Sequence, residues 1–432
     1  MSLAFTLCLL ALFGLAAIGT PIALSMIVSA IVYLAMSGQD LGLASEQMIQ
    51  GLYNSFILLA VPLFIVAANI MNAGTISDRL LNFCVAGVGR FRGGLGQVNV
   101  VASLIFSGMS GSAVADAAGI GKIIIGMMTK DGRYPPGYAA AITAASATIG
   151  PIIPPSIPMV MYALISDTSI GYLFLGGILP GLLMGAVLMA MNYMIARRRG
   201  FALEQPVPLR QLPKLTLNAF PALMMPVILL YGIYGGATTP TEAAAVAASY
   251  AFILAAVFYR ALTWRTIYGI MSESARAASA VGLVIGGALI FNYIVASENI
   301  PGKMADALVD LDITPLQFIL MVNLLFLLLG CVLDATTMIL VIVPLFIPAC
   351  RELGIDLVHF GVVIVVNTMI GLITPPYGIL LFVINGVTGI PFRSIIAEIW
   401  PFLGALLVAL LIMILTPGLI LWLPRIMGYV GN

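Results

Sequence analysis

Charged residues are what this sequence lacks. Only 8% of its 432 residues are Asp, Glu, Lys or Arg, and 62% are hydrophobic, whereas a soluble domain carries about 25% charged residues. A chain of this composition is excluded from the soluble globular class. Its apolar runs are instead roughly 20 residues long, the length that crosses a hydrocarbon core of about 30 Å. The composition therefore predicts a polytopic membrane protein that contacts the lipid bilayer.

Other absences exclude classes of function. There is one histidine, and the four cysteines form no Cys-x-x-Cys pair, so we expect packing roles for the cysteines. No basic cluster is interleaved with aromatics, which argues against nucleic-acid binding. No Ser-Lys pair or carboxylate pair stands at membrane depth outside two hairpins described below, and no chain of Lys, Glu or His offers a proton relay. We expect neither an enzyme nor an organic cofactor.

One short phrase occurs twice. Residues 149–155 read IGPIIPP and residues 370–376 read IGLITPP, so the second copy follows the first by 221 positions, and the same offset carries Pro180 onto Pro401. A single Pro pair in a span often marks only a kink. Two helices broken at matching places are instead typical of a duplicated carrier with its binding site at the membrane midplane.

The apolar runs give the expected spans. Single crossings are predicted near residues 3–36, 53–73, 138–165, 172–195, 217–235, 240–260, 277–297, 357–386 and 399–423, the first of them long and interrupted at Pro21. The first 36 residues carry no charge, so the basic region of a cleavable signal peptide is missing and we expect a retained span. Two further stretches, 98–129 and 315–350, have small or polar residues at their centres and are predicted to be re-entrant hairpins.

The strongest basic loop, RRRG at 197–200, sets the orientation. Placing it in the cytoplasm leaves only three basic residues outside, as the positive-inside rule expects: Lys303, Arg351 and Arg425. The N-terminus is then predicted inside and the C-terminus outside, and the two hairpins enter from opposite sides. The predicted fold is therefore all-α, an inverted repeat with two re-entrant helical hairpins and two Pro-broken helices.

The hairpin tips are the candidate sites. They read SGMSGSAVADAAG at 107–119 and FLLLGCVLDATTM at 326–338, and with a three-residue gap Asp116 aligns with Asp334. Hydroxyls and unwound carbonyls are hard ligands that suit sodium, while half-helix N-termini attract anions. Such small-residue stretches are also typical of close helix packing. Their occurrence in both halves, each beside a Pro-broken helix, favours an ion or substrate site.

The remaining polar residues have two readings each. A carboxylate at membrane depth costs about 2.5–3.5 kcal/mol, so Asp116 and Asp334 either cap a new helical half, which we favour, or bind the ion directly. Glu242, in TPTE, is expected to complete a capping box. His359 is expected near the outer surface, not as a ligand. Lys122 is expected to snorkel to the inner surface rather than meet a substrate carboxylate.

These motifs resemble, over nearly the whole chain, the large membrane subunit of tripartite ATP-independent periplasmic (TRAP) transporters, the DctM-like family. The matching segments, in order, are NAGTISDRL at 72–80, GGLGQVNVVAS at 93–103, SGSAVADAA at 110–118, IGPIIPPSIP at 149–158, TPTEAAAVAA at 239–248, LDATTMILVIVP at 333–344 and GLITPPYG at 371–378.

The resemblance implies an elevator-type carrier in the bacterial inner membrane. It would use a sodium gradient, not ATP, to take up an organic anion such as a C4-dicarboxylate, a sialic acid or another sugar acid. It also implies two partners, a periplasmic substrate-binding protein and a small four-helix membrane subunit, here expected as a separate chain. A stand-alone sodium/dicarboxylate symporter with a similar inverted repeat is the alternative.

The resemblance divides the chain as follows: scaffold spans at 1–75, an amphipathic arm at 76–97, a first transport-domain repeat at 98–195, a cytoplasmic basic loop at 196–216, scaffold spans at 217–297, an outer arm at 298–314, and a second transport-domain repeat at 315–423. It also implies sodium ligands at matching positions. They are Ser110, Gly111, Ser112, Gly150 and Pro154 for one site, and Gly330, Asp334, Thr336, Thr337, Gly371, Thr374 and Pro375 for the other. Substrate would lie near Pro155, Ser156 and Pro376.

Overall fold

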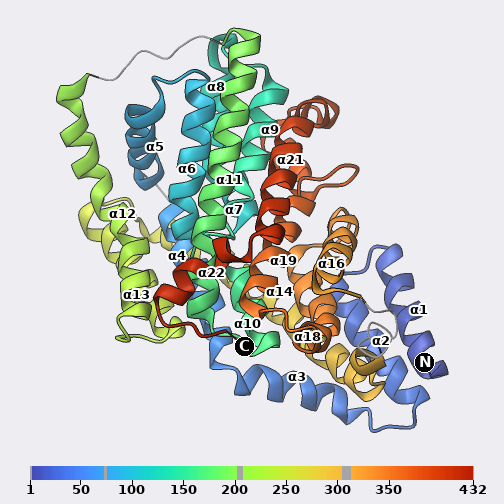
Figure 1. Ribbon diagram of the computed structural model, residues 1–432. Helices are drawn as coiled ribbons and strands as arrows, with labels where there is room; N and C mark the ends of the chain where they lie inside the picture. The colour runs from blue at the N-terminus through green and yellow to red at the C-terminus, as the bar shows by residue number, and fades with distance from the viewer. Residues whose placement is uncertain (1, 73–74, 202–207, 304–312, 432) are drawn as a thin grey trace.

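The computed structural model describes residues 2–72, 75–201, 208–303 and 313–431. Within these ranges the chain is helical and forms no strand (Figure 1). Six of the described helices are long and apolar enough to cross a membrane, and a seventh span results if one bent pair is counted. The predicted all-α membrane fold is confirmed.

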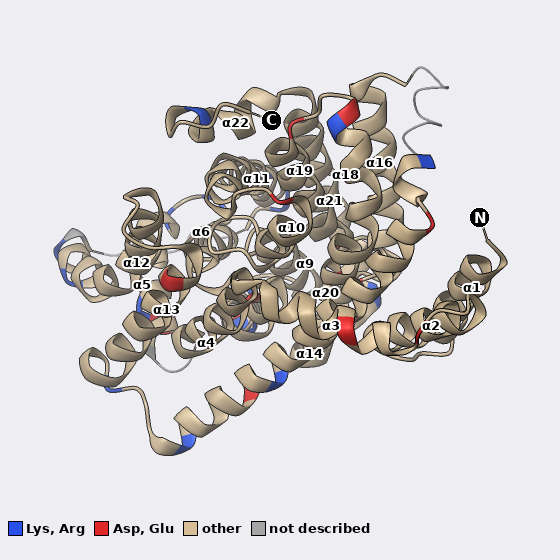
Figure 2. Cartoon of the chain, turned by 90° about the horizontal axis from the view of Figure 1, so that it is seen from below, with Lys and Arg blue, Asp and Glu red and all other residues tan. Residues whose placement is uncertain are grey.

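The N-terminal segment differs from its prediction. Residues 3–36 form two helices that lie side by side (Figures 1 and 2), so the prediction of one crossing is wrong. Gly19 has a φ of +87° and Pro21 follows it, and together they reverse the chain. The Ser2 backbone N–H donates to Glu298 at 3.3 Å. The N-terminus therefore lies at the same end as Glu298, not at the opposite end as predicted. The two helices are α1 (Leu3–Ala17) and α2 (Ile22–Met36).

Both predicted hairpins fold back on themselves. In the first, the Asn99 side chain of one arm lies 3.9 Å from the Met128 sulfur of the other. In the second, the rings of Phe318 and Phe326 lie 6.0 and 6.1 Å from the ring of Phe346 on the returning arm. The first hairpin comprises α6 (Gly94–Ser110), α7 (Ala113–Asp116), a π-helical turn (Ala117–Gly121) and α8 (Lys122–Thr129). The second comprises α16 (Pro315–Gly330), α17 (Ala335–Thr337), a π-helical turn (Met338–Ile342) and α18 (Val343–Glu352).

Each hairpin is followed by a broken helix, as predicted. The first is α9 (Pro136–Ala147) and α10 (Ile157–Ser166), and the second is α19 (Leu357–Gly371) and α20 (Ile379–Thr388). The Pro pair lies between the two halves in each case, because proline lacks the N–H that would continue the helical ladder. Both Pro–Pro peptide bonds are cis.

Other helices pack around the hairpins and the broken helices. They are α3 (Gly42–Asn54), α4 (Ala60–Asn72), α5 (Thr75–Val88), α11 (Ile170–Arg199), α12 (Leu212–Tyr234), α13 (Pro240–Ile253), α14 (Trp264–Ser297), α21 (Phe392–Leu415) and α22 (Pro417–Ile426). The last predicted crossing, 399–423, is corrected to α21, because the backbone leaves the helical region at Thr416 before Pro417 begins α22. The first predicted arm, 76–97, covers α5 except for Thr75 and also the start of α6. Most of the outer arm, at 304–312, lies outside the described residues.

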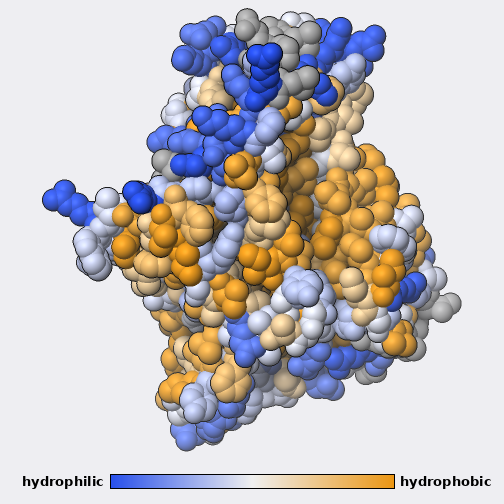
Figure 3. Space-filling model, turned by 90° about the vertical axis from the view of Figure 1, so that its left-hand side faces the viewer, coloured by the Kyte–Doolittle hydropathy of each residue, from blue (hydrophilic) through white to orange (hydrophobic). Residues whose placement is uncertain are grey.

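The surface has the pattern of a membrane protein. In Figure 3 hydrophilic residues gather at both ends of the molecule, and a broad apolar band lies between them. Over the molecule as a whole, large hydrophobic side chains such as Phe56, Tyr231 and Leu328 are exposed. Since water would make such exposure unfavourable, the band is the part that faces lipid.

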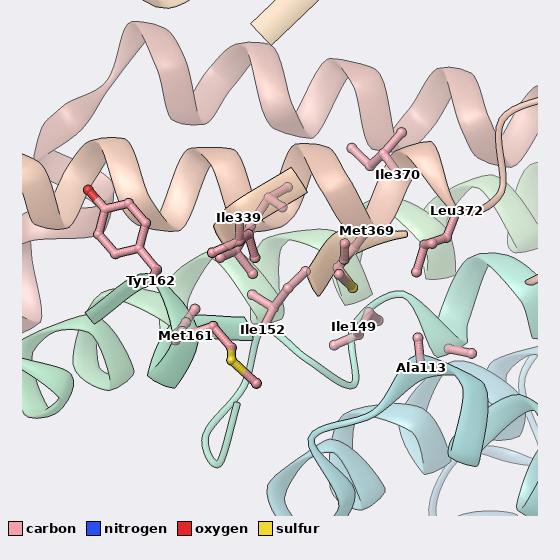
Figure 4. Packing of buried hydrophobic residues seen from close by; sticks show 14 of the residues in the cluster. Ala113, Ile149, Ile152, Met161, Tyr162, Ile339, Met369, Ile370 and Leu372 are labelled. Carbon is pink, nitrogen blue, oxygen red and sulfur yellow. The ribbon is translucent and has the colours of Figure 1, made fainter. Parts of the chain in front are cut away.

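The two repeats interlock at the centre (Figure 4). Ile152 of the first interrupted helix packs with Ile339 of the second hairpin and Met369 of the second interrupted helix, all of them buried. The Tyr162 hydroxyl donates to the Leu357 carbonyl at 2.7 Å. The halves therefore share one core, which holds the two hairpin tips in fixed relation.

Candidate functional site

A cavity of about 410 Å³ lies where the two hairpin tips meet. Ser110, Gly111 and Ser112 of the first tip line it, and so do Asp334 and Thr336 of the second. Two further helices also line it, through Ile65, Ala68 and Asn69 of α4 and through Glu273, Ala277 and Val281 of α14, and we call these residues the α4–α14 wall. Five of the predicted ion ligands, from segments far apart in sequence, therefore share one cavity.

The first tip rests directly on the first interrupted helix. Gly111 has a φ of +61°, and a Cβ added there would lie 2.5 Å from the Pro155 carbonyl oxygen, so only glycine permits this approach. Ser112 is the N-cap of α7, and its hydroxyl accepts a bond from the Ala115 N–H at 3.4 Å. The tip backbone and the unwound segment are thus in contact, as the sequence predicted.

Asp116 does not cap a helix, so that expectation is wrong. Ser112 already holds the N-cap position, and Asp116 is the last residue of α7. Its side chain is 2% exposed, and neither carboxylate oxygen has a hydrogen-bond partner among the described residues. A Cβ on Gly150 would lie 2.4 Å from one of those oxygens. The carboxylate therefore lies against the start of the unwound segment.

Asp334 does cap the second hairpin's new helical half. Its carboxylate accepts bonds from the Thr337 N–H at 3.0 Å and from the Thr337 hydroxyl at 2.5 Å. Below this tip the backbones of Gly330 and Gly371 touch, because a Cβ on Gly371 would lie 2.9 Å from the Gly330 Cα. The Thr374 hydroxyl donates to the Ile370 carbonyl at 2.8 Å within its own segment.

The π-helical turns show the true register of the repeat. They occupy 117–121 and 338–342, again 221 positions apart. Asp116 therefore corresponds to Thr337, and Asp334 lies beside the position of Ser112. The three-residue gap that aligned the two aspartates is wrong. The unbroken offset of the proline phrases was the signal that should have excluded the gap.

Several predicted residues lie behind the cavity instead of lining it. The Ser156 side chain is buried, bonds to the Pro151 carbonyl and caps α10. Pro155 lies under Gly111, and Pro376 is exposed outside the cavity lining. The cavity is therefore not lined by the three predicted substrate residues. Gly150, Pro154, Gly330, Thr337, Gly371, Thr374 and Pro375 also stand outside its lining.

Three further residues were singled out in the sequence. Thr239 and Glu242 form the predicted capping box, with the Thr239 N–H donating to Glu242 at 2.8 Å. His359 is not near the surface as expected, because it is buried with its Nε2 3.1 Å from the Met413 carbonyl oxygen. Lys122 is exposed and does not line the cavity.

The electrostatics of the cavity are unusual for an anion site. Among the described residues that line it there is no Lys, Arg or His, and two are carboxylates, Asp334 and Glu273. Ile157 and Ile379 also line it, and they are the first residues of the ten-residue helices α10 and α20, so the N-termini of both helices lie at the cavity. Helix N-termini carry partial positive charge, so these two N-termini are the part of the lining that attracts an anion. No group of three or more His, Cys, Asp or Glu that could hold a metal occurs in the described part of the chain.

The chain is similar to known transport proteins over most of its length. The family model for the tripartite ATP-independent periplasmic transporter, DctM component, matches residues 9–419. The sialic acid TRAP transporter large permease protein SiaM of Vibrio cholerae is 41% identical, over 96% of this chain and 97% of that protein. The C4-dicarboxylate TRAP transporter large permease protein DctM of Pseudomonas aeruginosa is 40% identical, over 86% and 87%.

Another relative is named for a different substrate. The 2,3-diketo-L-gulonate TRAP transporter large permease protein YiaN of Escherichia coli is 36% identical, over 95% of this chain and 96% of that protein. Among solved structures, the Alcanivorax borkumensis YdaH transporter superposes with a TM-score of 0.62 at 15% identity, covering 96% of this chain and 98% of that one. At that identity the likeness concerns the fold alone.

Proposed function

The chain belongs to the DctM component family of the TRAP transporters, and on that premise we propose that it is a permease subunit for sodium-driven uptake of a small organic anion. The family consists of transport proteins, not enzymes. We propose that it works in the bacterial inner membrane with a small membrane subunit, and that a periplasmic binding protein delivers its substrate. The substrates for which its relatives are named, sialic acid, C4-dicarboxylates and diketogulonate, all belong to the organic acids.

One observation carries the proposal: both tips and both interrupted helices meet at a single cavity that has no basic side chain in its described lining. A carboxylate entering it would meet two helix N-termini but also two acidic side chains. A cation about 4 Å away contributes about 4 kcal/mol at the effective dielectric of such sites. Sodium bound at the tips would supply that attraction, and uptake of the anion would then depend on the sodium gradient.

The proposed ligands are hard oxygens. At the first tip they are the Ser110 and Ser112 hydroxyls, backbone carbonyls beside Gly111 and Gly150, and the Asp116 carboxylate, whose buried oxygens have no partner in the described chain. Asp116 was not among the ligands that the family resemblance implied. We include it in the first site because its carboxylate lies against Gly150. At the second tip they are the Thr336 hydroxyl and carbonyls near Gly330 and Gly371. The Asp334 and Thr337 side chains already bond to each other.

Alternating access would follow from movement of the hairpins and broken helices, as one body, against α4 and α14. The arms and the division into scaffold and transport parts remain predictions. If the basic end with Arg197, Arg198 and Arg199 faces the cytoplasm, then Glu298 and Ser2, which are bonded to each other, face the periplasm.

The test is uptake in proteoliposomes that contain the chain and its small subunit, with and without the binding protein, under an inward sodium gradient. We expect uptake that needs both sodium and the binding protein. Potassium in place of sodium is the control, and Ser112→Ala or Thr336→Ala should raise the sodium concentration for half-maximal uptake. The exposed Ser45→Ala on α3 is the matched control. Uptake without the binding protein would favour a stand-alone symporter, and wild-type sodium dependence in both variants would refute the sites.

A further inference from the structure

The polar groups of the α4–α14 wall are hydrogen-bond acceptors. Glu273, Ala277 and Val281 stand four residues apart, so they form one face of α14 towards the cavity. The Asn69 amide donates to the Ser274 hydroxyl at 2.9 Å, which leaves its carbonyl oxygen free to accept. Both polar side chains of this wall can therefore accept hydrogen bonds from a ligand. The Asn69 amide also keeps one N–H that can donate, whereas the Glu273 carboxylate only accepts.

The rest of the lining has a different character. The first turns of α10 and α20 reach the cavity at Ile157 and Ile379, beside residues of the two tips. Helix N-termini favour negative charge, whereas the Asp334 carboxylate at the second tip already accepts bonds from Thr337. The helix N-termini therefore attract a carboxylate, and Glu273 repels one.

No basic side chain offsets the charge of Glu273 among the described residues that line the cavity. Glu273 and Arg276, one turn further along α14, are both exposed, but only Glu273 lines the cavity. A ligand with a carboxylate at each end would have to bring one of them towards Glu273. A ligand with hydroxyl or ammonium groups at that end would instead donate hydrogen bonds to a carboxylate, and such charge-assisted bonds are roughly twice as strong as neutral ones.

We propose that Glu273 determines substrate class: it accepts hydrogen bonds from hydroxyl or ammonium groups at the far end of the substrate, so the carrier takes hydroxylated or amino-bearing monocarboxylates and rejects dicarboxylates. Asn69 assists through its carbonyl oxygen. This inference rests on the proposed function, which places the substrate carboxylate at the hairpin tips. It adds that the other end of the substrate binds to Glu273. A sugar acid fits this description, and a four-carbon dicarboxylate does not.

The experiment measures ligand binding directly, because uptake would also report the selectivity of the binding protein. The permease with its small subunit, in lipid nanodiscs, is titrated calorimetrically in saturating sodium with gluconate, N-acetylneuraminate, succinate and fumarate. Glu273→Gln keeps the size of the side chain and removes the charge. Glu46→Gln, at an exposed position on α3 where Glu46 accepts from Gln50, is the matched control.

We expect the wild type to bind at least one of the two hydroxylated monocarboxylates about ten-fold or more tightly than either dicarboxylate. Glu273→Gln should lower the ratio of monocarboxylate to dicarboxylate affinity by about ten-fold. That change is small compared with the full repulsion between two nearby charges. Glu46→Gln should leave the ratio unchanged. Tighter dicarboxylate binding by the wild type, or a ratio that Glu273→Gln does not alter, would overturn the inference.

The remaining outcomes separate the two proposals. If Glu273→Gln raises the sodium requirement without changing the ratio, Glu273 serves the ion and the inference fails while sodium coupling stands. Binding that follows the expected ratio but ignores sodium would refute the coupling and support the selectivity. Absence of binding by all four acids would overturn both.

Discussion

The contact between Gly330 and Gly371 allows a sharp test of the second tip. A Cβ on Gly371 would lie 2.9, 3.0 and 3.1 Å from the Cα, carbonyl carbon and carbonyl oxygen of Gly330. All three atoms are backbone, so no flexible side chain can move aside. Gly371→Ala must therefore push the tip away from the unwound segment. Overpacking of this kind costs about 1–3 kcal/mol, which corresponds to roughly a 5- to 150-fold change in an equilibrium constant.

We expect that change to appear in sodium affinity. Gly371→Ala should raise the sodium concentration for half-maximal ligand binding at least about five-fold, measured in nanodiscs by titration with sodium at fixed ligand. Gly404→Ala is the control, because nothing lies within 4 Å of a Cβ there, and alanine favours a helix over glycine by roughly 0.5–1 kcal/mol. Circular dichroism checks that both variants remain helical. Wild-type sodium affinity in a folded Gly371→Ala protein would refute the second site as we have built it.

Three further changes test other parts of the structure. Asp116→Asn should raise the sodium requirement about ten-fold or more if its unpartnered oxygens hold the ion, and an unchanged sodium titration would make Asp116 a packing residue only. The Arg199 guanidinium donates to both Glu398 oxygens, at 2.9 and 2.7 Å, yet the pair is partly exposed. A double-mutant cycle of thermal stability, with alanine at each position, should therefore give a coupling free energy of only about 0.2–1 kcal/mol. That coupling should weaken in high salt. A coupling that salt does not reduce would contradict this. The Ser2 side chain bonds to Glu298 and lowers the pKa of that carboxyl below 4.5. Because a lowered pKa in the folded state adds stability above the unfolded pKa and loses it as pH falls, the protection of α1 amides from hydrogen exchange, relative to the intrinsic rate at each pH, should fall as Glu298 becomes protonated. Glu298→Gln should abolish that pH dependence of protection, and α1 protection that acid does not change would refute the anchor.

The sequence was sufficient where the signal was local or repeated. The hairpins and the broken helices both follow from composition, proline and the 221-residue offset. The capping box at Thr239 and Glu242 was likewise readable, because its two bonds join residues three apart.

Predictions from the sequence were wrong where the position of a local pattern depends on tertiary packing. Residues 3–36 were long enough for one tilted span, and only their packing side by side shows that the chain reverses at Gly19. The helical start at DAAG suggested a cap at Asp116, but the competing hydroxyl of Ser112 took that position. His359 was placed at the surface by its polar neighbours, although its partner, the Met413 carbonyl, lies on a helix 54 residues away in sequence.

Taken alone, then, the sequence determined the membrane class, the duplication and the two interrupted elements in each half, because hydropathy and proline act over a few residues and a repeat preserves its spacing. The tertiary structure decided that the tips share one cavity, that Asp116 faces Gly150, and that Glu273 of α14 supplies the facing charge. Those facts depend on which surfaces pack together. Glu273 lies more than 150 residues from the first tip and carries no motif, so nothing short of the folded chain could bring it to the site.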